Sequence, residues 1–463
     1  MERIPIKSFL NTSMRVIKTE NIPDDFILEG ISIDSRTIQP RQLFIAICGE
    51  NFDGHHFVKE AVNKGAVAVV IQENSEENFN DLDIGKIWVE DTVFFLMELA
   101  GWYRSQFDIP VISITGSTGK TTTKEMLSAI LEIDANVVKT QQNMNNFIGV
   151  SLTLFQITRK THKAIIELGT NHPGEMAQLA FISQPTHAAI TNIGHGHIGF
   201  FGSVENIYEE KIDLFKLMKG DGTAFLNMED KFLSKFKRSD IRLIKYGTSP
   251  EYDCYGKLLG SDDWGRVKFS VNNGPEIQLQ IPGRQQFYNG LLAASISLEM
   301  GVNMEKIRLG LSTVNSPDKR MEMFQYEGIL FINDTYNSNP ESLKAAIDFL
   351  YDLPKGTTAK KFLVVGDMLE LGNQSEYEHR MIGEYLSRKT FDFVFCLGEQ
   401  SKHILEGLEH DVTSRIEKAW FQSHQDLANA IKHYLGAGDI ILVKGSRGMT
   451  MENVLYCLGI GRS

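Results

Sequence analysis

Residues 115 to 122, with the sequence TGSTGKTT, have the composition of a loop that binds phosphate groups. A short β-branched run, Val111 to Ile114, precedes the loop and predicts a buried strand, and a helical pattern follows it. In a strand–loop–helix unit of this kind, backbone N–H groups and the helix N-terminus face the phosphates. The pattern therefore predicts a nucleoside triphosphate site formed by Gly116, Ser117, Thr118, Gly119, Lys120, Thr121 and Thr122.

The two residues after the second glycine have distinct chemical roles in such a loop. Lys120 is placed to reach the terminal phosphates, and the Thr121 hydroxyl is placed to bind Mg²⁺. The usual motif has about four residues between its first glycine and the Gly-Lys pair. Only Ser117 and Thr118 stand between Gly116 and Gly119, so this loop is a shortened variant. The alternative, an ordinary strand-to-helix turn, is disfavoured because Gly-Lys-Thr stands in the expected context.

One carboxylate stands near the end of a later predicted strand. Residues 163–169, KAIIELG, are apolar apart from Lys163 and Glu167. Ligands of open α/β sheets bind at the carboxyl ends of the strands, and Mg²⁺–ATP chemistry requires an acid that binds the metal. Glu167 is therefore a candidate metal ligand. The alternative is a solvated glutamate at a strand edge.

A lysine lies at the centre of an apolar helical stripe further along the chain. At about 100° per residue, Lys211 falls among the apolar residues Val204, Ile207, Tyr208, Ile212, Leu214, Phe215 and Met218. The charged residues expected on the opposite face are Glu205, Glu209, Glu210, Asp213 and Lys216. Burial of a lysine is costly unless the amine is paired or chemically altered, and a neutral amine reacts with carbon dioxide to give an anionic carbamate. The alternative is a lysine whose stem is buried and whose ammonium reaches water.

The segments on either side of this region read as further α/β units. Before it, strands are predicted at 43–47 and 66–71 and a helix at 57–64; after it, strands are predicted at 329–332, 362–365, 391–397 and 440–443. A hairpin is expected at 264–281. Strands that alternate with helices imply mostly parallel sheets. We therefore expect an α/β fold of three domains, with boundaries at 1–107, 108–314 and 315–463.

Composition excludes several classes of protein. The net charge of −12 argues against a nucleic-acid-binding surface. The four cysteines are far apart and lack metal-ligand spacing, which indicates free thiols in a reducing compartment. The most apolar window, 93–103, is short and contains Glu98, and the N-terminus lacks a signal-peptide core, so we predict a cytoplasmic protein that does not cross a membrane.

Together these motifs resemble the Mur ligase family over nearly the whole chain. The resemblance rests on the short phosphate loop, Glu167, the pair His197 and Lys211, and the segments at 283–289, 320, 334–340 and 444–447. It implies a small N-terminal domain that binds a UDP-linked substrate, a central ATPase-like domain and a Rossmann-like C-terminal domain. Segments 34–36, 53–55 and 366–372 most resemble the branch of the family that adds D-alanyl-D-alanine.

The resemblance implies an ATP-dependent peptide ligase of cell-wall precursor synthesis that acts through an acyl phosphate. Its expected substrates are UDP-N-acetylmuramoyl-tripeptide and D-alanyl-D-alanine, with ATP and two Mg²⁺ ions as cofactors and a monomer as the expected state. Thr121 and Glu167 would bind one Mg²⁺, and His197 and carbamylated Lys211 would bind the second, which makes Lys120, His197 and Lys211 the catalytic set. The expected adenine, phosphate and ribose contacts are Asn289, Arg320 and Asp334. The expected ligands of the UDP end are Ser35, Arg36, Asp53 and His55.

The C-terminal segment suggests a site for the incoming dipeptide. A dipeptide carboxylate requires a cationic, hydrogen-bonding pocket, which we expect from Lys444, Ser446 and Arg447. The alternative is that these cations cap a helix or pair with surface acids.

Two rival functions remain open at this stage. One is a sister ligase that adds another amino acid, including the folylpolyglutamate type, which lacks the N-terminal domain. The other is a nucleotide-dependent regulator or an inactive homologue, which would be expected to lose Glu167, His197 or Lys211, all of which are present.

Overall fold

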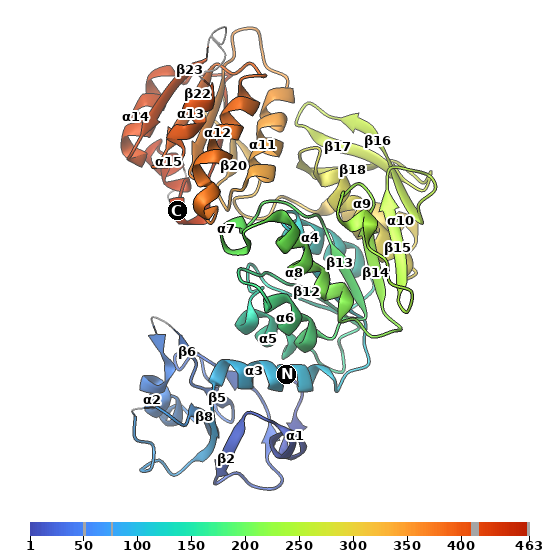
Figure 1. Cartoon of the computed structure of the whole chain (residues 1–463), viewed down its shortest axis with the longest axis vertical. Helices are drawn as coiled ribbons and strands as arrows, with labels where there is room; N and C mark the ends of the chain where they lie inside the picture. The colour runs from blue at the N-terminus through green and yellow to red at the C-terminus, as the bar shows by residue number, and fades with distance from the viewer. Residues whose placement is uncertain (50–51, 76, 409–415, 461–463) are drawn as a thin grey trace.

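The computed structural model describes residues 1–49, 52–75, 77–408 and 416–460. Three large sheets follow one another along the chain, and Figure 1 shows them as three separate bodies, coloured from blue through green and yellow to red. None of the helices in these ranges has the length and apolar character that a membrane crossing requires.

The N-terminal body is built on a five-stranded sheet in the order β2-β9-β8-β5-β4. All neighbouring strands are parallel except β2 and β9. Its elements are β1 (Ile4–Pro5), α1 (Lys7–Thr12), β2 (Val16–Glu20), β3 (Ile27–Leu28), β4 (Ile31–Ser32), β5 (Leu43–Ile45), β6 (Cys48–Gly49), β7 (Phe52–Asp53), α2 (Val58–Asn63), β8 (Ala68–Gln72), β9 (Gly85–Val89) and α3 (Thr92–Arg104). The predicted strands and helix of this region are confirmed, with ends that differ by a few residues.

The central body contains a nine-stranded sheet in the order β11-β12-β10-β13-β14-β15-β16-β17-β18. Pairing is parallel as far as β16 and antiparallel beyond it, so the predicted hairpin is confirmed as β17 and β18. Its elements are β10 (Val111–Thr115), α4 (Lys120–Leu131), β11 (Val137–Lys139), α5 (Phe147–Leu154), β12 (Lys163–Glu167), α6 (Glu175–Ser183), β13 (His187–Ile190), α7 (Ile198–Phe201), α8 (Val204–Lys216), β14 (Thr223–Asn227), β15 (Arg242–Gly247), β16 (Cys254–Ser261), β17 (Arg266–Val271), β18 (Ile277–Pro282), α9 (Gln286–Glu299) and α10 (Met304–Thr313).

The C-terminal body contains a six-stranded sheet in the order β19-β20-β24-β21-β22-β23. Only the edge pair β19–β20 is antiparallel. Its elements are β19 (Glu322–Tyr326), β20 (Ile329–Asp334), α11 (Pro340–Asp352), β21 (Lys361–Gly366), α12 (Ser375–Leu386), β22 (Phe393–Leu397), α13 (Lys402–Leu408), β23 (Glu417–Phe421), α14 (His424–Tyr434), β24 (Ile440–Lys444) and α15 (Glu452–Cys457). The two edge strands β19 and β23 were not predicted, because their sequences, EMFQY and EKAWF, form neither a continuous apolar run nor a strict alternation, and both strands are only partly buried.

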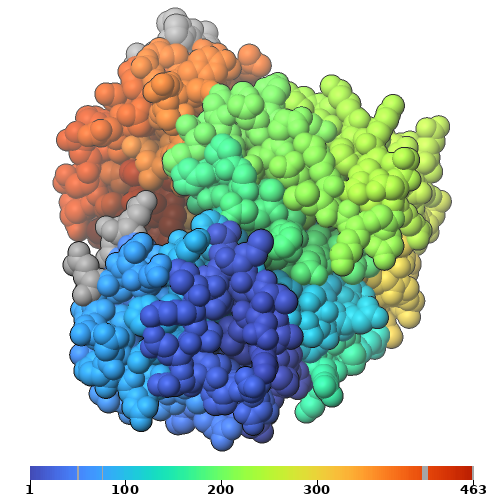
Figure 2. Space-filling view, turned by 60° about the horizontal axis from the view of Figure 1, so that its bottom comes forward, coloured from blue at the N-terminus to red at the C-terminus, as the bar shows by residue number. Residues whose placement is uncertain are grey.

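The three bodies share apolar cores at their junctions. One cluster joins Phe9 and Phe95 of the N-terminal body to Leu154 and Phe155 of the central body, and α3 packs against α5 and α6. Figure 2 shows the blue N-terminal atoms in continuous contact with the green central ones.

A second shared cluster joins the central and C-terminal bodies. It brings Ile198 and Phe201 of α7 and Ile207 of α8 together with Met368 and Leu371 of the C-terminal body. The short helix α7 is therefore the point at which the central domain enters the C-terminal core.

The α8 stripe is largely as predicted, with one correction. Lys211 is 2% exposed at the centre of the buried face. Glu210, predicted to face solvent, is 6% exposed. Its two carboxylate oxygens accept hydrogen bonds from the backbone N–H groups of Gly174 and Met176, both at 2.7 Å. The prediction was wrong because the N-terminus of α6 offers free donors, which helical periodicity does not reveal.

Candidate functional site

A cleft of about 640 Å³ lies between the central and C-terminal bodies. The central body contributes the phosphate loop, an amide cluster and the ends of β12 and β13. The C-terminal body contributes the loops that follow β20, β21 and β24. The predicted site residues that line it are Ser117, Thr118, Gly119, Lys120, Thr121, Thr122, Glu167, His197, Asn289, Arg320, Asp334 and Lys444.

The phosphate loop is hydrogen-bonded to the residues that follow the neighbouring strand β13. Gly116 and Gly119 have positive φ angles of 144° and 83°, and a Cβ atom at either position would collide with a neighbouring side chain. Asn192 accepts hydrogen bonds from the backbone N–H and the hydroxyl of Thr118, both at 3.1 Å. Thr191 donates to the Thr118 carbonyl at 2.5 Å. This support was not predictable from the loop motif, because it comes from the residues after β13 rather than from the loop itself.

Lys120 lies at the start of α4 with its side chain directed back over the loop. Its Nζ donates to the Gly116 carbonyl at 2.6 Å. Burial lowers the pKa of Lys120, while the carboxylate of Glu167 opposes that shift and Arg320 adds to it. The amine therefore lies among the charged groups of both bodies, where an anionic ligand would replace the carbonyl as its partner.

Thr121 and Glu167 meet at the bottom of the cleft, as the Mg²⁺ prediction requires. The Thr121 hydroxyl donates to Glu167 Oε1 at 3.2 Å, and the Asn145 amide donates to the same oxygen at 2.8 Å. Within the described residues, the buried Oε2 of Glu167 accepts no hydrogen bond. A buried carboxylate oxygen without a donor, next to a hydroxyl, fits the oxygen ligands that Mg²⁺ prefers.

Lys124 is a functional candidate that the sequence analysis missed. It lies one helical turn beyond Lys120 and is fully buried. Its Nζ donates to the Thr140 carbonyl at 2.6 Å and lies 3.7 Å from Glu167 Oε2. Its position four residues after Lys120 could have identified it from the sequence, because residues at i and i+4 lie on the same face of a helix. It supplies positive charge on the side of the Glu167 carboxylate away from Thr121.

His197 reaches across the domain boundary. Its Nδ1 lies 2.7 Å from Oε2 of Glu370, which follows β21 in the C-terminal body. His195, two residues earlier, pairs with Glu341 at the start of α11 and lies 3.8 Å from Glu378 of α12. These pairs were not predicted, because the partners are more than 140 residues apart in sequence.

Lys211 is buried and is not among the residues that line the cleft. Burial lowers its pKa to about 7, and nearby Lys120 lowers it further against the opposing effect of Glu210. Among the described residues, no carboxylate lies within ion-pair distance of its amine. A fully buried lysine that titrates near neutrality is nucleophilic at physiological pH.

The three residues expected to contact ATP line different parts of the cleft. Asn289 lies beside Gly119 and donates to Gln286 Oε1 at 2.8 Å. The Arg320 guanidinium stacks 3.8 Å above the Tyr336 ring. Asp334, at the end of β20, forms a 2.6 Å ion pair with Lys444.

The structure does not assemble the predicted dipeptide pocket. Lys444 is paired with Asp334 and also donates to the Asn337 carbonyl at 2.8 Å. The Ser446 hydroxyl is buried between the Ser338 carbonyl and the Leu369 N–H. Arg447 pairs with Glu452 at 2.9 Å, away from the cleft-lining residues. The shared carboxylate pocket therefore stays a prediction, and in this structure each of the three groups has a partner within the domain.

Comparison with known proteins decides the family. Family models match residues 28–103 (Mur ligase family, catalytic domain), 114–297 (Mur ligase middle domain) and 319–447 (Mur ligase, glutamate ligase domain). The UDP-N-acetylmuramoyl-tripeptide–D-alanyl-D-alanine ligase of Bacillus subtilis is 35% identical over 433 residues, which cover 93% of each chain. The enzyme of the same name from Escherichia coli is 31% identical over 442 residues, which cover 94% of each chain. The chain belongs to the Mur ligase family.

Solved structures of other proteins resemble this Mur ligase over nearly its whole length. A crystal structure of MurF from Acinetobacter baumannii superposes with a TM-score of 0.88 at 29% identity and covers 99% of both chains. MurF ligase from Thermotoga maritima, in complex with ADP, has a TM-score of 0.81 at 27% identity and covers 92% of this chain and 96% of that one. The architecture is therefore the three-domain Mur ligase fold.

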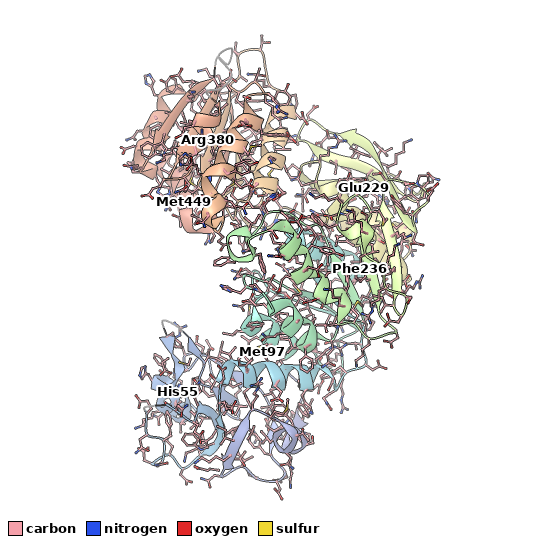
Figure 3. All side chains as sticks on the ribbon, viewed as in Figure 1. His55, Met97, Glu229, Phe236, Arg380 and Met449 are labelled. Atoms are coloured by element: carbon pink, nitrogen blue, oxygen red, sulfur yellow. The ribbon has the colours of Figure 1, made fainter. Side chains whose placement is uncertain are left out.

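The N-terminal candidates of this Mur ligase lie apart from the cleft. Figure 3 shows His55 in the N-terminal domain, far from Glu229, which lines the cleft. His55 is buried, with Nδ1 2.6 Å from Asp53 and Nε2 accepting from the Gln72 N–H at 2.9 Å. Ser35 donates to Glu60 at 3.0 Å, and Arg36 is exposed and pairs with Asp34 at 2.7 Å. These four residues therefore lie apart from the central site, with Ser35 and His55 buried and Arg36 exposed.

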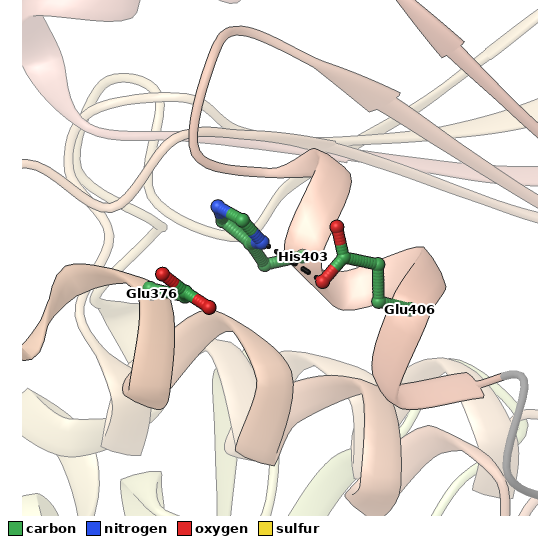
Figure 4. A group of neighbouring side chains, drawn as sticks. All are labelled: Glu376, His403 and Glu406. Carbon is green, nitrogen blue, oxygen red and sulfur yellow. Dashed lines mark hydrogen bonds and ion pairs between the residues drawn. The ribbon is translucent and has the colours of Figure 1, made fainter.

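A second group with metal-ligating atoms lies on the surface of the C-terminal domain. Glu376, His403 and Glu406 place one ligand atom each within 4.8 Å of one another (Figure 4). Arg380 bridges the two carboxylates at 3.2 and 2.6 Å, and His403 pairs with Glu406 at 3.0 Å. Because Arg380 pairs with both acids and His403 with one of them, an ion-pair network accounts for this group in this Mur ligase.

Proposed function

We propose that the chain is the ATP-dependent ligase that joins D-alanyl-D-alanine to UDP-N-acetylmuramoyl-tripeptide in peptidoglycan precursor synthesis. The observation that carries the proposal is the shared cleft, in which Lys120 and Glu167 of the central domain face Arg320 and Asp334 of the C-terminal domain. The relatives from Bacillus subtilis and Escherichia coli bear the name of this reaction. The ADP in the Thermotoga maritima structure supports ATP as the nucleotide.

The proposed chemistry has two steps. A carboxylate oxygen of the tripeptide attacks the γ-phosphorus of ATP. The bond between that phosphorus and the β,γ-bridging oxygen breaks, ADP leaves, and the tripeptide becomes an acyl phosphate. The dipeptide amine then attacks the carbonyl carbon of the acyl phosphate and loses a proton. The tetrahedral intermediate collapses when its bond to the phosphate oxygen breaks, which releases phosphate and leaves the peptide bond. Lys120 stabilises the negative charge on the transferring phosphoryl group, and the amide donors of the loop hold the phosphates in line.

Thr121 and Glu167 would hold one Mg²⁺, which supplies charge neutralisation to the β- and γ-phosphates. Asn145 donates to the same Glu167 oxygen as Thr121, and Lys124 lies 3.7 Å from the other oxygen, so the two residues keep the carboxylate oriented. His197 would bind a second Mg²⁺ through Nε2, the ring nitrogen that its contact with Glu370 leaves free.

We propose in addition that Lys211 carries a carbamate. Its burial, its pKa of about 7 and the lack of an acidic partner among the described residues support this modification, because the neutral amine is the form that reacts with carbon dioxide. The resulting anion would offset the positive charge of Lys120 and supply oxygen ligands to the second Mg²⁺.

The remaining candidates keep roles that follow from their positions. Asn289, Arg320 and Asp334 are proposed to contact the adenine, phosphate and ribose parts of ATP. Ser35, Arg36, Asp53 and His55 are proposed to hold the UDP end of the precursor on the N-terminal domain. Arg447, whose side chain is 58% exposed, is the member of the predicted dipeptide set that remains accessible to a carboxylate.

An isotope experiment tests the proposed chemistry. The tripeptide precursor with ¹⁸O in its terminal carboxylate is incubated with ATP, Mg²⁺ and D-alanyl-D-alanine, and the released phosphate is analysed by mass spectrometry. The proposal predicts one ¹⁸O atom in each phosphate and no phosphate release without the precursor. Phosphate that contains no ¹⁸O would exclude the acyl-phosphate route.

A further inference from the structure

Arg320 is a cation that faces the cleft without an acidic partner. It lines the cleft from the segment that precedes β19. Within the part of the chain that the structure describes, its guanidinium forms neither an ion pair nor a hydrogen bond. By contrast, Lys444 of the same cleft pairs with Asp334 at 2.6 Å. The charge of Arg320 is therefore available to an anionic ligand.

The contact that Arg320 does make is with an aromatic ring. Its guanidinium carbon lies 3.8 Å from the centroid of the Tyr336 ring. Tyr336 follows β20 by two residues and also lines the cleft. The face of an aromatic ring attracts a cation without neutralising it. The guanidinium is therefore held in place while its charge and its N–H donors remain free for a ligand.

The backbone brings the two side chains together. The Tyr336 N–H donates to the Lys319 carbonyl at 3.0 Å, and the Met321 N–H donates to Asp334 Oδ1 at 3.0 Å. Lys319 and Met321, which flank Arg320, have φ angles of 56° and 53°, in the left-handed region that non-glycine residues rarely occupy. Such conformations persist where the surrounding structure dictates them, and they concentrate at functional sites. The segment is therefore shaped to place Arg320 over the ring.

Arg320 and Lys120 approach the cleft from different domains. Both residues line it, and the charge of Arg320 lowers the pKa of Lys120, so the two cations lie within electrostatic reach of each other. Like charges repel unless an anion lies near both of them. The phosphate groups of a nucleotide supply such an anion, and the Tyr336 ring holds Arg320 against the repulsion until they arrive.

We propose that Tyr336 is a positioning residue for nucleotide binding: its ring holds the Arg320 guanidinium in the orientation that receives the phosphate groups. The proposal rests on the proposed function, specifically on the contact between Arg320 and phosphate. A guanidinium binds phosphate through two parallel hydrogen bonds only from a suitable orientation. A side chain that is already held in that orientation loses less conformational freedom when the ligand binds.

The test is a double-mutant cycle on the full chain. The variants are Tyr336→Leu, which removes the ring, Arg320→Met, which removes the charge, and the combination of both. Isothermal titration calorimetry measures the Kd of a non-hydrolysable ATP analogue in the presence of Mg²⁺, and circular dichroism checks the fold of each variant. Tyr336→Phe keeps the ring face and removes the hydroxyl. Phe94→Leu is the matched control, because it removes a ring that lies 4.9 Å from the Arg15 guanidinium, away from the cleft-lining residues.

We expect Tyr336→Leu to weaken binding of the analogue roughly 3- to 30-fold, the range that a cation–π contact supplies. Arg320→Met should weaken binding roughly 10- to 100-fold, because hydrogen bonds to a charged group are lost. Adding Tyr336→Leu to Arg320→Met should cause no further loss, because the ring acts through the guanidinium. Tyr336→Phe and Phe94→Leu should bind the analogue like the unaltered chain.

Three results would overturn the inference. Unchanged binding in Tyr336→Leu, with weak binding in Arg320→Met, would remove the positioning role and leave the proposed function standing. A further loss when Tyr336→Leu is added to Arg320→Met would show that the ring contacts the nucleotide itself or only supports the fold. Unchanged binding in Arg320→Met would refute the proposed contact between Arg320 and phosphate, and the inference with it.

Discussion

Lys444 and Asp334 form a 2.6 Å ion pair between the ends of the adjacent strands β24 and β20. Their side chains are 2% and 11% exposed. The pair therefore lies in a setting where loss of one partner leaves a buried, uncompensated charge.

We expect Lys444→Met to lower the free energy of unfolding by ~3–5 kcal/mol, because Asp334 is left buried without its cation. Urea denaturation measures the effect. Lys355→Met is the matched control: Lys355 pairs with Asp392 at 2.7 Å, but both side chains are more than one-third exposed. The control substitution should lower the free energy of unfolding by no more than ~1 kcal/mol. Equal effects of the two changes would show that the buried pair contributes no more than a surface pair.

Lys120→Ala should reduce the rate of ligation by a factor on the order of 10²–10³ or more, because it removes charge that stabilises the transferring phosphoryl group. Phosphate release measures the rate, and circular dichroism checks that the fold is retained. Lys216→Ala, on the exposed face of α8, is the control and should leave the rate unchanged. Normal turnover in Lys120→Ala would mean that the loop is only structural.

The carbamate proposed at Lys211 is open to direct observation. In buffer with ¹³C-bicarbonate, the chain should show a carbamate ¹³C resonance that Lys211→Ala lacks. The variant should lose most of its activity, and small carboxylic acids should restore part of it by occupying the vacated anionic position. Full activity in Lys211→Ala, or identical ¹³C spectra, would contradict the proposal.

Much of the site was predictable because its chemistry is local in sequence. The phosphate loop lies between β10 and α4, and Lys211 lies at the centre of its buried stripe, as periodicity predicts. Contacts between distant segments were not predictable in this way. Glu210 caps another helix, and His197 pairs with an acid of another domain, because both partners are set by tertiary packing.

The predicted dipeptide pocket illustrates the same limit. A cluster of Lys444, Ser446 and Arg447 looks available in sequence, yet the fold supplies each with an internal partner. Residue type indicates what a side chain is able to bind, whereas its partner depends on which strand ends are adjacent.

Stability should depend on pH through His187 at the start of β13. Burial lowers the pKa of this imidazole to about 4, from an ordinary value of 6.5. Between these values the unfolded chain binds a proton that the folded chain does not, so the free energy of unfolding should fall as pH decreases from about 6.5 to about 4. His187→Gln should weaken this dependence, as measured by denaturation at several pH values. An unchanged slope would show that His187 is not the group responsible.

The most direct test of the central claim compares amines. The chain is incubated with ATP, Mg²⁺ and the UDP-linked tripeptide, and D-alanyl-D-alanine, D-glutamate, L-alanine and diaminopimelate are supplied one at a time while product mass and phosphate release are followed. We predict that D-alanyl-D-alanine gives the fastest phosphate release, with a product heavier than the precursor by the dipeptide less one water. Faster ligation of any of the three single amino acids would contradict the assignment of the substrate pair.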